Sequence, residues 1–183
     1  MKLLSIKKSN LLLFVASLAV TFAMNAQVGG WKPDLSKDSK AAIENLKKDN
    51  PSIVSYYDKA YGFAVFPKVT KAGLVIGGAG AKGIVFKNKV PVGSSKLKQA
   101  SVGLQAGAQQ YSEVIFFENK KAFENFTNGK LKFDGQATAV AIKKGVALDI
   151  AYEDGVAVFT KAIGGLMFEA SLGGQHFTYE AKK

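Results

Sequence analysis

Apolar residues recur at helical spacing in the segment 35–49, which predicts a helix there. They share one face of that helix, and the lysines lie largely around it. These apolar positions are Leu35, Ala42, Ile43 and Leu46. The Asn50-Pro51 pair favours the end of this helix and the start of a second one, with Asn50 as its cap and Pro51 at its first position. We expect the second helix to end at Gly62.

After Gly62 the apolar residues alternate with small or polar ones, as is typical of strands. Residues 101–109 alternate cleanly, with Val102 and Leu104 on the apolar side, which predicts a half-buried strand. Residues 114–117 are apolar on both sides, as expected for a central strand. Further strands are expected at 63–66, 72–76, 83–86, 146–153, 166–172 and 177–179, with Pro67 ending the first and Asn88 marking a turn after the third.

A short helix interrupts the strands, with Asn119 as its cap and Gly129 at its end. Consecutive strands joined by short glycine or asparagine turns favour antiparallel pairing. The chain has 19 glycines, many of them inside the expected strands, and this indicates strong curvature. The predicted fold class is α+β: N-terminal helices packed on a strongly curved, largely antiparallel, glycine-rich sheet with one short inserted helix.

Residues 1–26 have the pattern of a signal peptide. Lys2, Lys7 and Lys8 precede an uncharged apolar stretch that is shorter than the roughly 20 residues a membrane-spanning helix needs. Ala26 suggests cleavage before Gln27, and an uncleaved N-terminal anchor is the alternative. We therefore expect a signal peptide at 1–26, a linker at 27–34 and one domain at 35–183 in an exported protein.

The residue inventory excludes several kinds of site. The chain has no cysteine, which excludes disulfides, thiolate metal sites and a lipoprotein anchor. Its single histidine, His176, leaves little for acid–base or nucleophilic catalysis and is expected to be an exposed strand residue. All 25 basic residues are lysines, and the absence of arginine argues against sequence-specific nucleic-acid binding. The sequence thus predicts no catalytic site, no metal and no cofactor.

The segment 78–83 matches the G-x-G-x-x-G pattern of dinucleotide-binding loops. In that fold the loop must open a helix, whereas here the apolar residues Ile84, Val85 and Phe86 follow and favour a strand. An acidic residue about 20 positions later is also required, and none occurs between Asp58 and Glu113. We therefore interpret the segment as a glycine-rich hairpin with positive backbone φ angles.

Positive charge is concentrated in one part of the sequence. Cleavage after Ala26 would lower the net charge from +11 to +8, and residues 59–112 carry eight lysines and no acid, while the rest of the mature chain is balanced. Such a segment predicts a face that attracts phosphate-rich surfaces, and a solvated face that only maintains solubility is the alternative. The candidate lipid-binding residues are Lys68, Lys71, Lys82, Lys87, Lys89, Lys96 and Lys98.

Several short motifs in order resemble the SYLF domain, a lipid-binding family, over about residues 35–179. They are Tyr61-Gly62-Phe63-Ala64-Val65-Phe66-Pro67, Lys71-Ala72-Gly73-Leu74, the glycine-rich segment 77–83, Gly103-Leu104-Gln105-Ala106-Gly107-Ala108-Gln109, Val114-Ile115-Phe116-Phe117-Glu118-Asn119, the short helix 122–126, Gly164-Gly165-Leu166 and Leu172-Gly173-Gly174. One departure is the segment 91–96, which lacks the tryptophan that many members carry before the Gly-x-Gln-x-Gly strand.

The resemblance implies a non-catalytic module that binds anionic phospholipid. We do not extend the actin binding of some eukaryotic members to a chain with a bacterial-looking signal peptide. The resemblance and the lysine-rich segment together predict a protein whose partner is an anionic phospholipid surface and not nucleic acid. With the signal peptide, we expect this protein to be exported and to be periplasmic or peripheral on an envelope membrane. The alternatives from the residues are a small outer-membrane β-barrel or envelope structural protein, and an enzyme, which the scarcity of histidine and cysteine opposes.

Overall fold

The computed structural model describes residues 33–131, 133–134, 140–141 and 151–183. The chain divides into two units, Met1–Gly30 and Trp31–Lys183, and only the second contains described residues. The predicted signal peptide, residues 27–32 of the predicted linker and most of the strand expected at 146–153 therefore lie outside the described residues. The last two residues of the predicted linker, Pro33 and Asp34, begin a helix, so the linker is wrong at that end. The elements are α2 (Pro33–Asp49), α3 (Ile53–Lys59), β1 (Gly62–Lys87), β2 (Val90–Phe117), α4 (Lys120–Thr127), β3 (Phe133–Asp134), β4 (Val140–Ala141) and β5 (Val156–Ala181).

The two N-terminal helices confirm the helical pattern of the sequence. In α2, Ile43 and Leu46 are buried, as their spacing predicts. The side-chain oxygen of Asn50 accepts a hydrogen bond from the Ser52 backbone N–H at 3.0 Å. The N-cap of the second helix is Ser52 and α3 begins at Ile53, so the prediction of Asn50 as its cap and Pro51 as its first residue is wrong by two residues. The expectation that this helix runs to Gly62 is wrong, because α3 ends at Lys59 and Gly62 is the first residue of β1.

The separate short strands expected from the sequence are three long strands instead. β1 has 26 residues and continues through Pro67, where a register shift between Phe66 and Val69 absorbs the proline. β2 has 28 residues and β5 has 26, and β2 pairs antiparallel with both. The sheet order is β1-β2-β5-β3, with the short β4 pairing parallel to β5. The α+β class and the largely antiparallel sheet are thus confirmed, and the sheet formed by the described strands is not closed.

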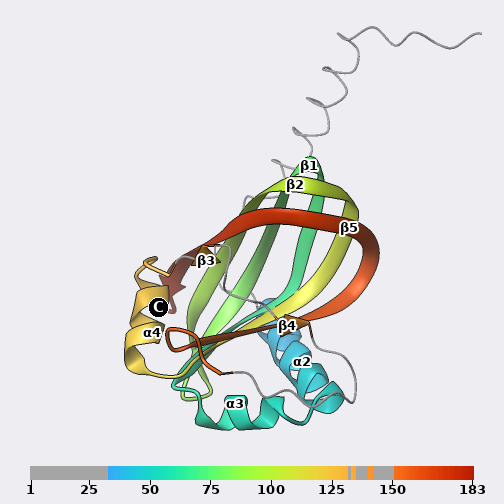
Figure 1. Cartoon of the computed structure of the whole chain (residues 1–183). Helices are drawn as coiled ribbons and strands as arrows, with labels where there is room; N and C mark the ends of the chain where they lie inside the picture. Colours follow the sequence, from blue (N-terminus) through green and yellow to red (C-terminus); the bar gives the residue numbers. More distant parts are fainter. Residues whose placement is uncertain (1–32, 132, 135–139, 142–150) are drawn as a thin grey trace, which may run out of the picture. The chain divides into compact units, whose positions relative to one another are not determined.

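Each long strand curves so far that its two ends come close together (Figure 1). In β1, the backbone N–H of Asn88, just beyond the strand, donates to the carbonyl of Tyr61, just before it, at 3.2 Å. The approach is so close that a Cβ on Gly83 would lie 2.5 Å from the carbonyl oxygen of Val65. Asn88 and Lys89 form the predicted turn to β2, with the positive φ angles of 49° and 65° that a tight hairpin needs.

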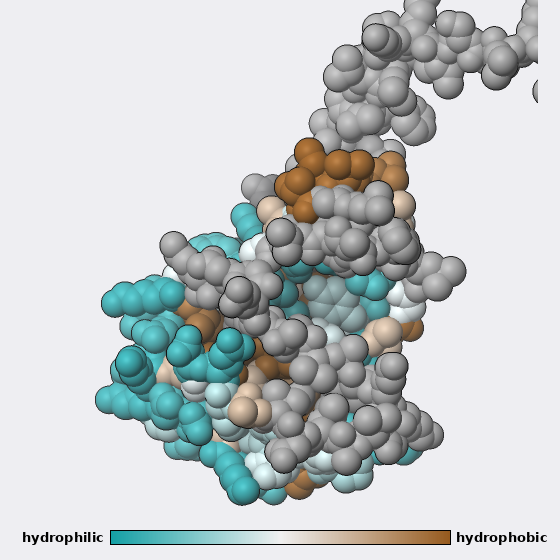
Figure 2. Space-filling view, viewed as in Figure 1, coloured by the Kyte–Doolittle hydropathy of each residue, from teal (hydrophilic) through white to brown (hydrophobic). Residues whose placement is uncertain are grey.

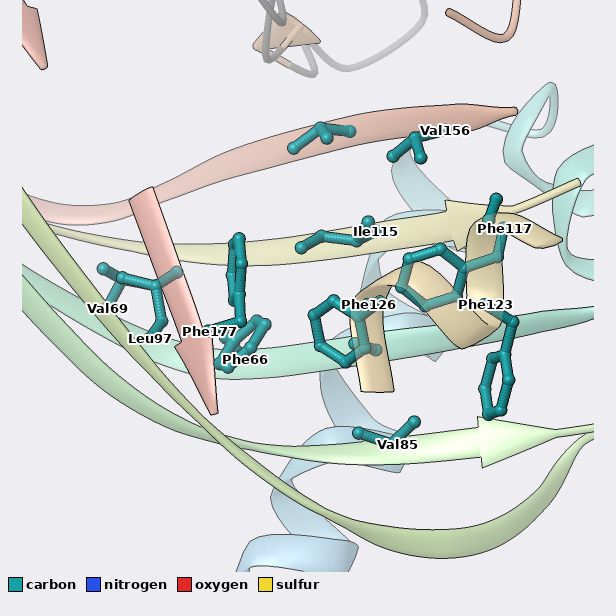
Figure 3. Packing of buried hydrophobic residues seen from close by; sticks show 13 residues of the cluster. Phe66, Val69, Val85, Leu97, Ile115, Phe117, Phe123, Phe126, Val156 and Phe177 are labelled. Carbon is teal, nitrogen blue, oxygen red and sulfur yellow. The ribbon is translucent and has the colours of Figure 1, made fainter. Parts of the chain in front are cut away.

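The inner face of the curved sheet packs against α4. Asn119 caps this helix as predicted, its side-chain oxygen accepting from the Ala122 N–H at 3.0 Å. The ring of Phe126 lies 4.8 Å from that of Phe117 and 5.2 Å from that of Phe177, which joins α4 to β2 and β5 (Figure 3). Each fully buried side chain of this kind stabilises the fold by roughly 1.5–3 kcal/mol. We call the buried cluster that contains Phe117, Phe126 and Phe177 the inner core.

The outer face of the sheet packs against α2 and α3. Ile43 and Leu46 of α2 and Ile53 of α3 lie with Phe63 and Phe116 in a second buried cluster, the outer core. Residues 114–117 alternate between the two clusters and are fully buried, which confirms the prediction of a central strand. Both cores lie where the strand ends meet, so the middle of each long strand extends beyond them.

Candidate functional site

The middle segments of β1 and β2 form an exposed apolar surface, which we call the apolar arch. Its members are Leu74, Val75 and Ile76 of β1 and Val102 of β2, which are 74%, 62%, 72% and 64% exposed. A hydrophobic patch is visible over the end of the sheet that carries the β1 and β2 labels (Figures 1 and 2). In β5, Ile163 is 54% exposed as well. Such a group of large apolar side chains in contact with water marks an interaction surface.

The sequence predicted the wrong environment for this part of the chain. The alternation at 101–109 predicts burial of the apolar side that includes Val102, but Val102 is exposed, and so are Ala106 and Ala108 further along the same side. The opposite residue, Ser101, is buried instead. Val102 is exposed because the arch lies beyond both cores. In this part of the strand, the alternation of apolar and polar residues therefore does not correspond to a buried face and a solvated face.

The backbone of the arch is irregular at its apex. Leu74 pairs with Ala106 and Ile76 with Val102, so three residues of β2 stand opposite the single residue Val75 of β1. Val75 has a φ of 67°, a conformation that is unusual for a β-branched residue. Backbone strain of this kind concentrates at functional sites.

Three of the seven candidate lysines lie together on the outer face of the sheet, near the arch. In the register of the sheet Lys82 stands opposite Lys96, and Lys98 is two residues further along β2 toward the arch. Lys98 precedes Val102 by four residues, a separation of about 13 Å along a strand. We call Lys82, Lys96 and Lys98 the outer lysines.

The other four candidate lysines do not join this group. Lys89 is at the far end of β1 and donates to Asp58 at 2.6 Å, which lowers the pKa of Asp58 and raises that of Lys89. Lys87 lies over the ring of Tyr61 with its Nζ 5.2 Å from the ring centroid. Lys71 is almost fully buried, and Lys68 lines a groove beside α2. The lysine-rich segment is therefore one unit in sequence but several separate sites in space.

The groove beside α2 has a volume of about 500 Å³. Lys68 and Asp38 both line it, together with the small apolar residues Ala41, Ala42 and Ala162. Lys161 lines it too and forms an ion pair with Asp49. Because both signs of charge line the groove, it has no clear preference for an anion.

The inner face carries a polar group next to the inner core. The side-chain amide of Gln175 donates to Glu113 Oε2 at 3.1 Å and to Gln99 Oε1 at 3.4 Å. Glu113 is fully buried, and its other carboxyl oxygen has no hydrogen-bond partner. Burial raises the pKa of Glu113 to about 7, against the smaller lowering effect of the Gln175 amide. Nothing in the local sequence pattern around Glu113 predicts its burial.

The glycine-rich segment 78–83 is neither a dinucleotide loop nor a hairpin. It lies inside β1 and is followed by more strand, not by a helix. The positive-φ glycines of the described residues are Gly107, Gly129 and Gly155, so the hairpin interpretation is wrong. What requires glycine at position 83 is the close approach of Val65 and Phe66.

Two further features are absent from the described residues. No group of three or more histidine, cysteine or acidic side chains among them could hold a metal ion. None of the helices in the described part of the chain is long and apolar enough to cross a membrane. His176 is exposed on β5, as the sequence predicted.

These observations define an α+β domain with a strongly curved sheet and an exposed apolar arch as its main surface feature. Residues 98–182 match the Ysc84 family, described as Las17-binding protein actin regulator, which confirms the SYLF resemblance over that segment. This is a family of non-enzymatic domains known for binding lipids and actin regulators. The match covers the arch residue Val102 and the outer lysine Lys98, whereas β1 precedes it.

The chain is also similar to a curated bacterial protein. The chain is 27% identical over 155 residues to Beta cell expansion factor A of Aeromonas veronii. That comparison covers 79% of this chain and 59% of the relative, so the chain spans less than two thirds of the relative's length.

Proposed function

We propose that this protein binds anionic phospholipid membranes through the apolar arch and the outer lysines, without catalysis. The observation that carries the proposal is the exposure of Leu74, Ile76 and Val102 at one end of the sheet. The lipid binding known for the SYLF family supports it.

The arch would supply the apolar part of the binding energy. Moving its side chains from water into the boundary between headgroups and acyl chains removes exposed apolar area, at about 25 cal/mol per Å². The segment Ala72–Ala81 suits this location, because it consists only of glycine and apolar residues. The two cores stay outside the membrane, since they lie where the strand ends meet.

The outer lysines would supply the electrostatic part. Lys98 lies about 13 Å along its strand from Val102, close enough for its flexible side chain to contact headgroup phosphates while the arch enters the interface. Lys82 and Lys96 are six residues from Ile76 and Val102, about 20 Å, and would interact with the charged surface over that longer distance. A lysine near an anionic surface contributes about 1 kcal/mol. Lysine binds phosphate as a mobile point charge, so binding should follow the charge of the membrane more than the identity of the headgroup.

Export is part of the same proposal. The pattern of residues 1–26 favours cleavage near Gln27 and release into an envelope compartment, periplasmic or peripheral on a membrane. The intact mass of the protein from its native host tests this, and retention of residues 1–26 would contradict it.

The test of the proposal is flotation of the purified protein with vesicles of phosphatidylcholine containing phosphatidylglycerol. The double variant Leu74→Gln, Ile76→Gln should float much less than the wild type, because both side chains are exposed and belong to the arch. The matched control is Val54→Gln, Val90→Gln, which changes two exposed apolar side chains away from the arch, on α3 and at the start of β2. The control should float like the wild type.

Circular dichroism of both variants checks that the fold is intact. Equal flotation of the arch variant and the control would remove the arch from the binding surface. A wild type that does not float with anionic vesicles at low salt would overturn the lipid proposal itself.

A further inference from the structure

The edge of β1 next to the arch has a feature that membrane binding alone does not explain. Among the described residues, β2 is the only strand that pairs with β1. The residues Ile76–Ala81 pair on one side with residues 97–102 of β2, from Ile76 with Val102 to Ala81 with Leu97. No other described strand pairs with them, so their other side is an edge of the sheet that the described residues form. We call the segment Ile76–Ala81 the β1 edge.

The β1 edge lacks the devices that protect sheet edges. Exposed edges in natural proteins carry charges, prolines or bulges that prevent pairing with another strand. The β1 edge contains only isoleucine, glycine and alanine, and its ladder to β2 is regular from Ile76 to Val85. Gly78 and Gly80 are exposed, so no bulky side chain at these positions hinders an approaching strand.

Entry into a membrane makes an open edge unfavourable. Below the headgroup–acyl boundary, in the hydrocarbon region, backbone N–H and carbonyl groups lose their water partners, and open sheet edges exposed to lipid do not persist. Ile76 belongs both to the arch and to the β1 edge, so placing the arch in the interface brings the start of the edge to the same depth.

We propose that two copies of this chain pair through their β1 edges when they bind a membrane, forming a dimer with a continuous antiparallel sheet. This inference rests on the proposed function and deepens it. A second copy fits because its edge is identical, and two antiparallel edges related by a two-fold axis satisfy each other. The β1 edge carries no charge, so the two copies would meet there without repulsion between like charges.

The absence of cysteine from the chain makes a direct test simple. Gly78→Cys and Gly80→Cys place a thiol at the β1 edge, where a Cβ would lie 3.5 Å from the Gln99 carbonyl and 3.9 Å from the Leu97 carbonyl. The control is Gly164→Cys on β5, where a Cβ would contact nothing within 4 Å. Each variant is treated with a short bis-maleimide, with and without phosphatidylglycerol vesicles, and flotation is measured in the same samples.

The expected result is a crosslinked dimer of the two β1-edge variants on vesicles, no dimer without vesicles, and no dimer of the control. Flotation without a dimer, or equal dimer from Gly164→Cys, would overturn the pairing and leave lipid binding intact. A dimer that forms equally without vesicles would overturn the dependence on the membrane. Failure of the variants and of the wild type to float would overturn both proposals.

Discussion

Gly83 shows how a single residue allows the two ends of β1 to meet. A Cβ at this position would lie 2.5 Å from the Val65 carbonyl and 2.6 Å from the Phe66 ring, and the backbone contact cannot be relieved by a side-chain rotation. Gly83→Ala should therefore destabilise the protein by roughly 1–3 kcal/mol. Gly80→Ala is the matched control, since its nearest neighbour would be 3.9 Å away. Urea unfolding measures both, and an equal effect of the two changes would contradict the packing explanation.

Glu113 should make the stability of the protein depend on pH. Its pKa in the folded protein is raised to about 7 from an ordinary value of 4.5, so between these pH values the folded state holds a proton that the unfolded state has lost. Stability should then fall as the pH rises from about 5 to 7, by about 3 kcal/mol in total.

The neutral variant Glu113→Gln should remove most of this dependence and should melt at a higher temperature than the wild type at pH 8. Melting curves at pH 5 and pH 8 measure the effect. A wild type that is as stable at pH 8 as at pH 5 would show that the buried carboxyl is not protonated in the folded state.

At the scale of elements, the sequence predicts the helices better than the strands. The spacing of Ile43 and Leu46 and the cap at Asn119 are local signals, and both are confirmed. The length of β1 is not a local property, because Pro67 and the glycines look like strand ends unless the pairing with β2 is known. The arch was missed for the same reason: whether Val102 is buried depends on how far the cores extend, not on its neighbours in sequence.

At the scale of the whole molecule, the predicted lysine face is divided by the fold. The charge of residues 59–112 is a property of the sequence, but Lys89 is paired with Asp58 and Lys71 is buried. The outer lysines lie together because the β1–β2 register places Lys82 and Lys96 opposite each other, and Lys98 lies nearest to the arch. The order of lysines in the sequence does not predict which of them share a face, because that depends on the pairing of β1 with β2.

This arrangement predicts unequal effects of lysine replacement on membrane binding. Changing the three outer lysines to glutamine should weaken binding to anionic vesicles at low salt by on the order of 100-fold, at about 1 kcal/mol per lysine. The same number of changes on or next to α4 should weaken it much less. The two sets are Lys82, Lys96 and Lys98, and Lys120, Lys121 and Lys130.

Vesicle titration at rising ionic strength compares the two sets. The difference between them should shrink as salt increases, since the screening length falls to roughly 10 Å at 0.1 M. Equal losses in both sets would mean that total charge, and not a face, governs binding.

The three-strand pairing through the arch also restricts how this protein can change in evolution. A residue inserted near Val75 disturbs the hydrogen-bonded ladder between β1 and β2. A residue inserted in the middle of β2 disturbs the ladder between β1 and β2 and also the ladder between β2 and β5. Three residues of β2 stand opposite the single residue Val75, so at this place the sheet already accommodates a β2 strand that is longer than β1. Relatives should therefore differ in length at this apex or in the loops, and elsewhere in the sheet their strands should lengthen or shorten together.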